Sequence, residues 1–424
     1  MVAPPAVPQD TTTTQPAAAP RLAGLTPTEL QERYHRELFS GLLPFWAEHG
    51  IDQERGGFIC SLDYDGTRIS TEKQVWFQGR GIWVYSFLYN HFDRNPAYLE
   101  VARKTKEFVL EHAPQPDGWW AESLSETGEA LKPFGGDVYG MYFTAEGLQE
   151  YAVAAGDEQA LETAKSLIHK LHAYISRPGF RMMGTGAPGV RAQGLWMVNL
   201  RIATQMLARA KDPRIEAIAE ESVDAIVNRH YNPEIGLNNE LLHLNFSRVK
   251  GEENQSLLGH SIETLWMVMD EARRRGDQPL WQTCADRIHH HLDVGWDYVY
   301  GGLAHMVDVD AGCHKWPPEH PVGTKLEFRF VGEYHYMKTV WALNEVLVAT
   351  LKIYQRTRAA WAQKYFGMAQ KTIDDKLAVR QYGTPGFMLF SDRKMQRVPH
   401  TARQDNYHPL RQLMLNLLTL KRMV

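Results

Sequence analysis

Cysteine is scarce in this chain of 424 residues. Its three cysteines, Cys60, Cys284 and Cys313, are an odd number and lack CxxC spacing. A disulfide framework needs paired cysteines, and a structural zinc site needs closely spaced cysteine and histidine ligands. The sequence therefore predicts neither, and it favours a reducing compartment, which we expect to be the cytoplasm.

An excess of charge and a long apolar run are also missing. The 46 Lys and Arg residues nearly balance the 50 Asp and Glu residues, so nothing in the net charge of −4 favours nucleic acid or an anionic membrane as partner. No apolar run reaches the roughly 18 residues that a membrane helix needs. Residues 1–20 are rich in Pro, Thr and Ala and lack the regions of a signal peptide, which predicts a disordered tail before a single domain over 21–424.

Familiar catalytic motifs are absent too. The chain has no GxSxG elbow, no GxxxxGK[ST] phosphate loop, no GxGxxG after a strand and no HExxH metal motif. We therefore expect no bound metal. Glycoside hydrolysis by paired carboxylates stays open at this point, because 50 acidic residues offer many pairs.

What the chain does contain is a repeat. Apolar residues recur at helical spacing in about twelve segments that come in pairs, and a short glycine-led stretch with hairpin turn signals follows each pair. The helical segments are 27–49, 75–93, 96–112, 137–155, 158–175, 192–210, 212–229, 258–276, 278–294, 334–356, 358–375 and 406–422. The leading glycines are Gly57, Gly118, Gly179, Gly236, Gly302 and Gly386.

Six repeats of this kind predict an all-α fold, an (α/α)6 barrel with short β-hairpin loops on one rim. A helix pair cannot bury its apolar face alone, and only a closed ring leaves no exposed end. An open helical solenoid is the alternative that the pattern allows.

Two histidines begin predicted helices. His260 follows Gly259, with Glu263 one turn later on the same face, and His408 precedes Pro409, a residue favoured at the first helical position. The positive end of a helix macrodipole disfavours an imidazolium. We therefore expect both imidazoles to be neutral near pH 7 and able to accept a proton, as general acid–base catalysis requires.

Tryptophans are frequent in the second helix of the pairs and at the starts of loops, among them Trp76 and Trp341. Pyranose faces stack on aromatic rings, while polar groups hold the hydroxyls. We expect these two rings to line a sugar-binding funnel, with Asn199 among the polar contacts.

Five stretches carry a family resemblance: "FWAEHGIDQERGGFICSLDYDG", "KQVWFQGRGIWVYSFLY", "LGHSIETLW", "HYMKTVWALNEVLVA" and "NYHPLRQLM". In this order they resemble the N-acylglucosamine 2-epimerase family, which includes cellobiose and mannose 2-epimerases and aldose–ketose isomerases. The resemblance covers residue 28 to the C-terminus. It implies an (α/α)6 barrel that inverts C2 of an unprotected aldose by means of two histidines.

Motif by motif, the resemblance implies the catalytic pair His260 and His408. It implies Arg80 as the group that stabilises the enediolate oxygens, since the negative charge formed at O1 and O2 needs a cation or strong donors. Further site residues implied in this way are Glu263 and Glu345, to orient an imidazole or hold sugar hydroxyls, and Arg411, as a second cation.

Substrate and reaction are less defined. Met197 and Asn199 stand where cellobiose epimerases often have histidine, which favours a monosaccharide of the N-acetylglucosamine/N-acetylmannosamine or glucose/mannose type. An aldose–ketose isomerase of mannose/fructose type and a non-catalytic sugar- or protein-binding relative stay open. Some family members use ATP as an activator that is not consumed, and dimers are common, so the resemblance leaves a nucleotide effector open and implies a homodimer.

Overall fold

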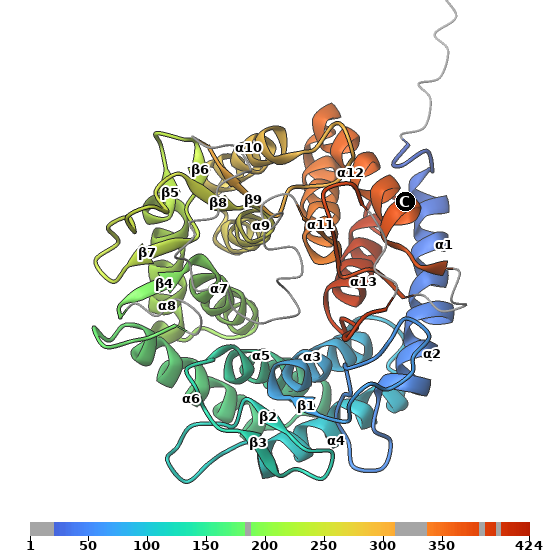
Figure 1. Cartoon of the computed structure of the whole chain (residues 1–424), viewed down its shortest axis with the longest axis vertical. Helices are drawn as coiled ribbons and strands as arrows, with labels where there is room; N and C mark the ends of the chain where they lie inside the picture. The colour runs from blue at the N-terminus through green and yellow to red at the C-terminus, as the bar shows by residue number, and fades with distance from the viewer. Residues whose placement is uncertain (1–20, 183–187, 310–336, 381–385, 396–399) are drawn as a thin grey trace, which may run out of the picture.

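The computed structural model describes residues 21–182, 188–309, 337–380, 386–395 and 400–424. These residues form a ring of helices around a central axis (Figure 1). The inner helices are α3 Val75–His91, α5 Tyr139–Ala155, α7 Gln193–Leu207, α9 Leu258–Arg275, α11 Val340–Thr357 and α13 His408–Leu420. The outer helices are α1 Pro27–Glu37, with the short α2 Leu43–Phe45, α4 Pro96–His112, α6 Glu158–Ile175, α8 Pro213–Asp224, α10 Gln278–Gly295 and α12 Ala360–Thr372. π-helical turns extend the outer layer at η1 Leu38–Leu42, η2 Trp46–Gly50, η3 Ala225–Arg229 and η5 Ile373–Leu377.

The two layers differ in how their helices begin. Most outer helices carry a side-chain cap, such as Thr26, which forms a capping box with Glu29 before α1, and Asp157, which accepts a hydrogen bond from the backbone of Ala160 in α6. The inner helices have no side-chain cap bond and are buried around most of their circumference, so their stability comes from packing.

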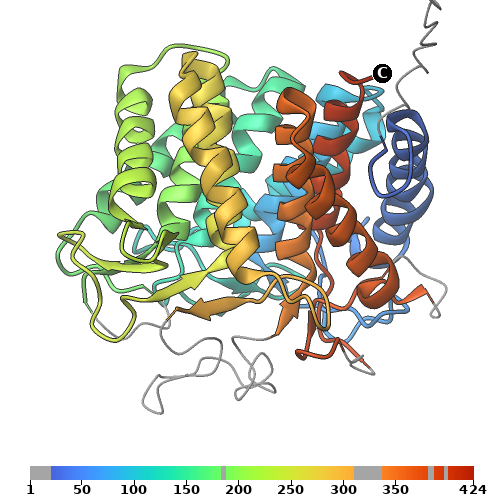
Figure 2. The same ribbon diagram turned by 90° about the horizontal axis from the view of Figure 1, so that it is seen from above.

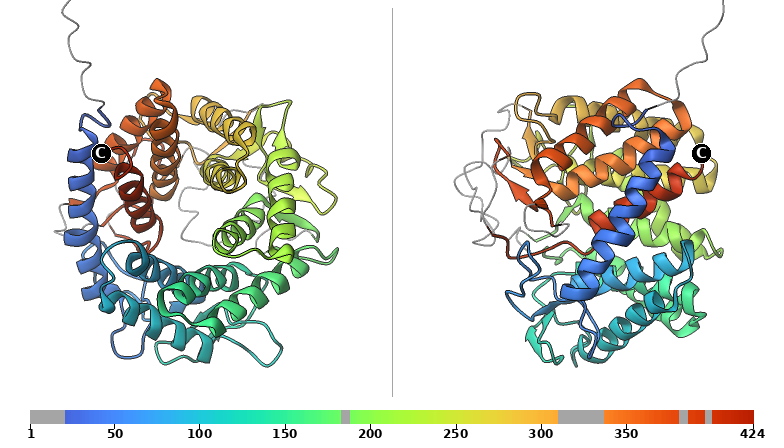
Figure 3. Two further views of the ribbon diagram at one scale, coloured as in Figure 1. Left: turned by 180° about the vertical axis from the view of Figure 1, so that it is seen from behind. Right: turned by 90° about the vertical axis from the view of Figure 1, so that its right-hand side faces the viewer.

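Contacts between the two ends of the chain close the ring. Helix α1 packs against α13, and α13 in turn contacts both α11 and α3; Figure 3 shows α1 lying across α13. The predicted (α/α)6 barrel is therefore correct, and the open solenoid is excluded because the first and last helices cover each other.

Short strands gather on one rim, at the end where the inner helices begin (Figure 2). They are β1 Lys73–Gln74, β2 Ser123–Leu124, β3 Ala130–Lys132, β4 Val190–Ala192, β5 Tyr231–Asn232, β6 Leu237–Asn238, β7 Leu241–His243, β8 Gln255–Leu257, β9 Met306–Asp308, β10 Lys338–Thr339 and β11 Phe390–Ser391. The hairpin prediction is correct for β2–β3 and β5–β6. The ladders β1–β2, β4–β7, β8–β9 and β10–β11 instead join consecutive repeats. A strand that directly precedes an inner helix therefore pairs with a strand of the next loop along the rim.

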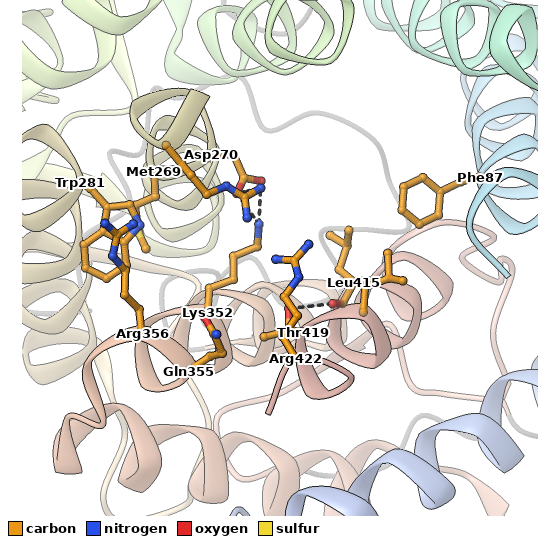
Figure 4. A pocket seen from close by; sticks show the side chains of 12 residues that line it. Phe87, Met269, Asp270, Trp281, Lys352, Gln355, Arg356, Leu415, Thr419 and Arg422 are labelled. Atoms are coloured by element: carbon orange, nitrogen blue, oxygen red, sulfur yellow. Dashed lines mark hydrogen bonds and ion pairs between the residues drawn. The ribbon is translucent and has the colours of Figure 1, made fainter. Parts of the chain in front are cut away.

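The opposite end of the barrel holds a cavity of about 230 Å³ (Figure 4). Its charged lining comes from the last turns of α9 and α11 and from the end of the chain: Asp270, Arg273, Lys352, Arg356 and Arg422. The Lys352 ammonium donates to both Asp270 oxygens at 2.6 Å and lies 4.7 Å from the centre of the Trp266 indole ring.

Some sequence predictions fall outside the described residues, namely the tail over 1–20 and Cys313. Cys60 and Cys284 are buried free thiols. Among the described residues, no helix is both long and apolar enough to cross a membrane.

Candidate active site

The two predicted histidines meet at the strand-bearing rim. His408 is the first residue of α13, and His260 lies in the first turn of α9. Their ring centres lie 5.8 Å and 5.3 Å from that of Trp341, which is in the first turn of α11. Three inner helices thus bring two imidazoles to one indole.

A buried carboxylate fixes the His408 ring. Asp405 Oδ2 lies 2.6 Å from His408 Nδ1, while Asp405 Oδ1 accepts the backbone N–H of Tyr407 at 2.9 Å. Burial alone would raise the pKa of Asp405, but His408 and Arg80 hold it well below its usual range. The ionised carboxylate accepts the Nδ1 proton, so His408 Nε2 is the nitrogen left for a substrate.

His260 has an equivalent partner in Glu240, whose Oε1 lies 3.0 Å from His260 Nδ1. Burial alone would lower the pKa of His260, but the charges of Glu240 and Glu263 raise it above its usual range. The direction of this shift is opposite to the one expected from the helix terminus, because the two carboxylates favour the imidazolium.

Glu263 and Glu345 both bind Arg411. The Arg411 Nη2 group donates to Glu345 Oε1 at 2.6 Å and also to Glu263 Oε1, and the Trp266 indole N–H donates to the other Glu345 oxygen at 2.8 Å. Burial would raise the pKa of Glu263, but Arg411 and His408 lower it to about 2. Burial raises the pKa of Glu345, and Glu263 adds to this rise. The hydrogen bonds that orient the two imidazoles therefore come from Asp405 and Glu240.

Glu263, Glu345 and His408 also bring three donor atoms within 4.8 Å of one another, a spacing that suits a metal ion. The guanidinium of Arg411 already neutralises the two carboxylates of this group. The cluster therefore already has a cation of its own.

Arg80 lies in a cradle of aromatic rings. Its Cζ is 4.1 Å from the ring centre of Phe143, 4.7 Å from Tyr407 and 4.9 Å from Trp76. Among the described residues no carboxylate lies within ion-pair distance of it, and burial, together with Arg411, lowers its pKa. A buried guanidinium held by π faces keeps its donors for an anionic partner.

The residues predicted to contact a sugar differ in how deeply they are buried. Trp76 is half-buried and stacks on Tyr139, with ring centres 5.4 Å apart. Asn199 is fully buried on α7. Gly259 has a clear packing role, because a Cβ at this position would lie 2.4 Å from the Trp341 ring.

Sequence reasoning missed Asp405 and Glu240. Asp405 precedes His408 by one helical turn, a spacing that could have marked it as a cap and a partner. Glu240 lies 20 residues before His260 in a loop between strands, and no local pattern identifies it.

Comparisons with known proteins identify relatives of this chain. The family model described as N-acylglucosamine 2-epimerase matches residues 56–411. The N-acylglucosamine 2-epimerase of Bos taurus is 27% identical over 77% of this chain and 76% of its own length. The cellobiose 2-epimerase of Bacteroides fragilis is 23% identical over 72% of this chain and 83% of its own.

Solved structures support the fold. The cellobiose 2-epimerase from Bacillus thermoamylovorans superposes with a TM-score of 0.76 at 17% identity, covering 93% of this chain and 100% of that one. A D-mannose isomerase superposes with a TM-score of 0.74 at 13% identity, covering 93% and 98%. With a family model that spans most of its length, the chain belongs to the N-acylglucosamine 2-epimerase family.

Proposed function

We propose that this sugar epimerase inverts C2 of an unprotected aldose by proton transfer between two histidines. One observation carries the proposal: His260 and His408 both contact Trp341, and each has a carboxylate at Nδ1 that leaves Nε2 for the substrate. Two imidazoles that both present Nε2 to the substrate suit a reaction that removes a proton from one face of C2 and returns a proton to the other face.

The chemistry starts from the open-chain sugar, because C2–H is acidic only when C1 is a carbonyl. One imidazole takes the C2 proton through Nε2, and the electron pair moves to O1 to give an enediolate, or a 2-acetamido enolate when C2 carries an N-acetylamino group. Arg80 supports this step, since a guanidinium without a carboxylate partner among the described residues can donate to O1 as its charge grows. The second imidazole then protonates C2 from the opposite face.

The charges around the two histidines favour different roles for them, one as acid and one as base. Glu240 and Glu263 raise the pKa of His260 above its usual range, which favours His260 as the acid for one epimer. His408 then serves as the base, with its ring fixed by Asp405. The roles exchange for the reverse reaction, as microscopic reversibility demands.

For the substrate we propose a monosaccharide of the N-acetylglucosamine/N-acetylmannosamine or glucose/mannose type. The similarity to mammalian proteins named N-acylglucosamine 2-epimerase supports the first pair. Met197, in place of a histidine, lines a small cavity of about 10 Å³ with Glu263 and Arg411 and provides no extra polar contact for a second sugar ring.

The proposal is tested by incubating the protein in D2O with N-acetylglucosamine, mannose, glucose and cellobiose, and following C1, C2 and the products by NMR. We expect deuterium at C2 and formation of the C2 epimer. Label at C1 with a ketose product would instead identify an aldose–ketose isomerase, and no exchange with any sugar would identify a binding protein. Running the assay with and without ATP tests the nucleotide effector.

Two variants test the mechanism in the same assay. His260→Ala and His408→Ala should each lose at least about 10²-fold in turnover, because each removes a positioned acid or base. Either variant keeping more than about a tenth of the wild-type rate would contradict the two-histidine mechanism.

A further inference from the structure

A second buried ion pair lies directly beneath the site. Glu146 of α5 and Arg201 of α7 are 1% and 8% exposed, and Arg201 Nε donates to Glu146 Oε1 at 2.5 Å. Neither side chain has a hydrogen bond to His260 or His408 among the described residues. The proposed proton transfers do not use this pair, so its cost of burial calls for another explanation.

Tyr407 joins this pair to the site. Its hydroxyl donates to Glu146 Oε2 at 2.8 Å and accepts from Arg411 Nη1 at 3.2 Å. Its ring faces Arg80, and the next residue in the chain is His408. One phenol, fully buried, therefore contacts both guanidinium groups of the site and precedes a catalytic histidine.

Glu146 determines how this phenol is held. A tyrosine hydroxyl has one proton to donate, and Arg411 can only donate to it. Glu146 is the acceptor of that proton, so the carboxylate fixes the hydroxyl in the orientation that accepts from Arg411. The cavity at this level has a volume of only about 10 Å³, so at most one water could take the place of the Glu146 carboxylate as acceptor of the Tyr407 proton.

We propose that Glu146 is a positioning residue for epimerisation, acting through Tyr407 on Arg411 and Arg80. This inference rests on the proposed function, because it concerns the rate of the same C2 proton transfer. Glu146 itself contacts no substrate. Its effect is to hold the phenol, and with it the two guanidinium groups, in the geometry that stabilises the enediolate.

The test is a double-mutant cycle of Glu146→Gln, Tyr407→Phe and the double variant. We expect each single variant to lower kcat about 10- to 100-fold, the loss associated with one charge-assisted hydrogen bond, while KM changes little. Because both changes break the same contact, the double variant should be no slower than about threefold below the slower single variant. Multiplied losses, or losses in KM alone, would overturn the proposal.

Glu150→Gln is the matched control. Glu150 lies one turn further along α5, is 2% exposed and pairs with Arg209 at 2.7 Å; among the described residues it forms no hydrogen bond or ion pair with His260 or His408. We expect it to lower the melting temperature as Glu146→Gln does but to keep the wild-type kcat. If Glu146→Gln and Glu150→Gln change melting temperature and kcat alike, Glu146 has only a structural role.

The outcome of this double-mutant cycle can be distinguished from the outcome of the test of the proposed function. Failure of the two-histidine mechanism would appear as retained epimerisation in His260→Ala or His408→Ala. Failure of this inference would appear as an inactive pair of histidine variants beside a Glu146→Gln variant with normal kcat.

Discussion

Replacing Glu240 by glutamine should change the pH dependence of catalysis in a defined direction. Glu240 Oε1 lies 3.0 Å from His260 Nδ1, and the glutamine amide in the variant keeps the size of the side chain but not its charge. The negative charge stabilises the imidazolium, so its removal lowers the pKa of His260. In the wild type, the imidazolium therefore persists to a higher pH than in Glu240→Gln.

The size of the shift follows from distance and exposure. An opposite charge within about 4–6 Å moves a pKa by about 1–3 units. The His260 side chain is 28% exposed, so water screens part of the interaction, and the shift should be smaller than that of a pair wholly removed from water.

The assay is kcat/KM against pH for the epimer whose reaction uses His260 as the acid. The alkaline limb should move to lower pH in Glu240→Gln, because this limb reports loss of the acid's proton in the free enzyme. Glu234→Gln, at an exposed glutamate of the same loop region, is the control and should leave the profile unchanged. A pH-independent loss in Glu240→Gln, or an unmoved alkaline limb, would refute the reasoning.

Three further variants probe the same rim. Asp405→Asn should lower kcat about 10²- to 10⁴-fold with a small change in KM, because the His408 ring loses the acceptor at Nδ1; equal turnover in steady-state assays would contradict this role. Arg80→Lys should lower kcat and C2 exchange into D2O together, since a lysine keeps the positive charge but not the planar set of N–H donors of a guanidinium; an effect on KM alone would mean that Arg80 binds the sugar equally in the ground state and the transition state. Gly259→Ala should lower both melting temperature and kcat, because the added Cβ displaces Trp341; normal values in calorimetry and kinetics would show that the ring adapts.

Sequence periodicity predicted the helices well because each inner helix is specified by its own residues. The segment 258–276 is observed as α9 Leu258–Arg275, and 406–422 as α13 His408–Leu420. The strand pairs were predicted less well, since β8 and β9 lie in different repeats and meet only when the ring closes. Local pattern fixes local structure, whereas pairing across repeats depends on the whole barrel.

The site shows the same division. His260 and His408 could be found because each stands at a helix start within a recognisable motif. Glu240 could not, and neither could Glu146, which is 261 residues from its partner Tyr407 in the sequence. Buried ion pairs and imidazole partners are matched by contact in space, and a single sequence records no such contact.

The common direction of the inner helices gives the barrel an electric polarity. Each helix carries about half a positive charge at its first turn and half a negative charge at its last. All six inner helices begin at the strand-bearing rim, so their positive ends surround the enediolate that we propose. The negative ends lie at the opposite end of the barrel. There the positive side chains of Arg273, Lys352 and Arg356, in the last two turns of α9 and α11, offset the negative charge. The scaffold itself thus favours anionic intermediates at one mouth only, and the carboxylates beside His260 are what favour its imidazolium in that field.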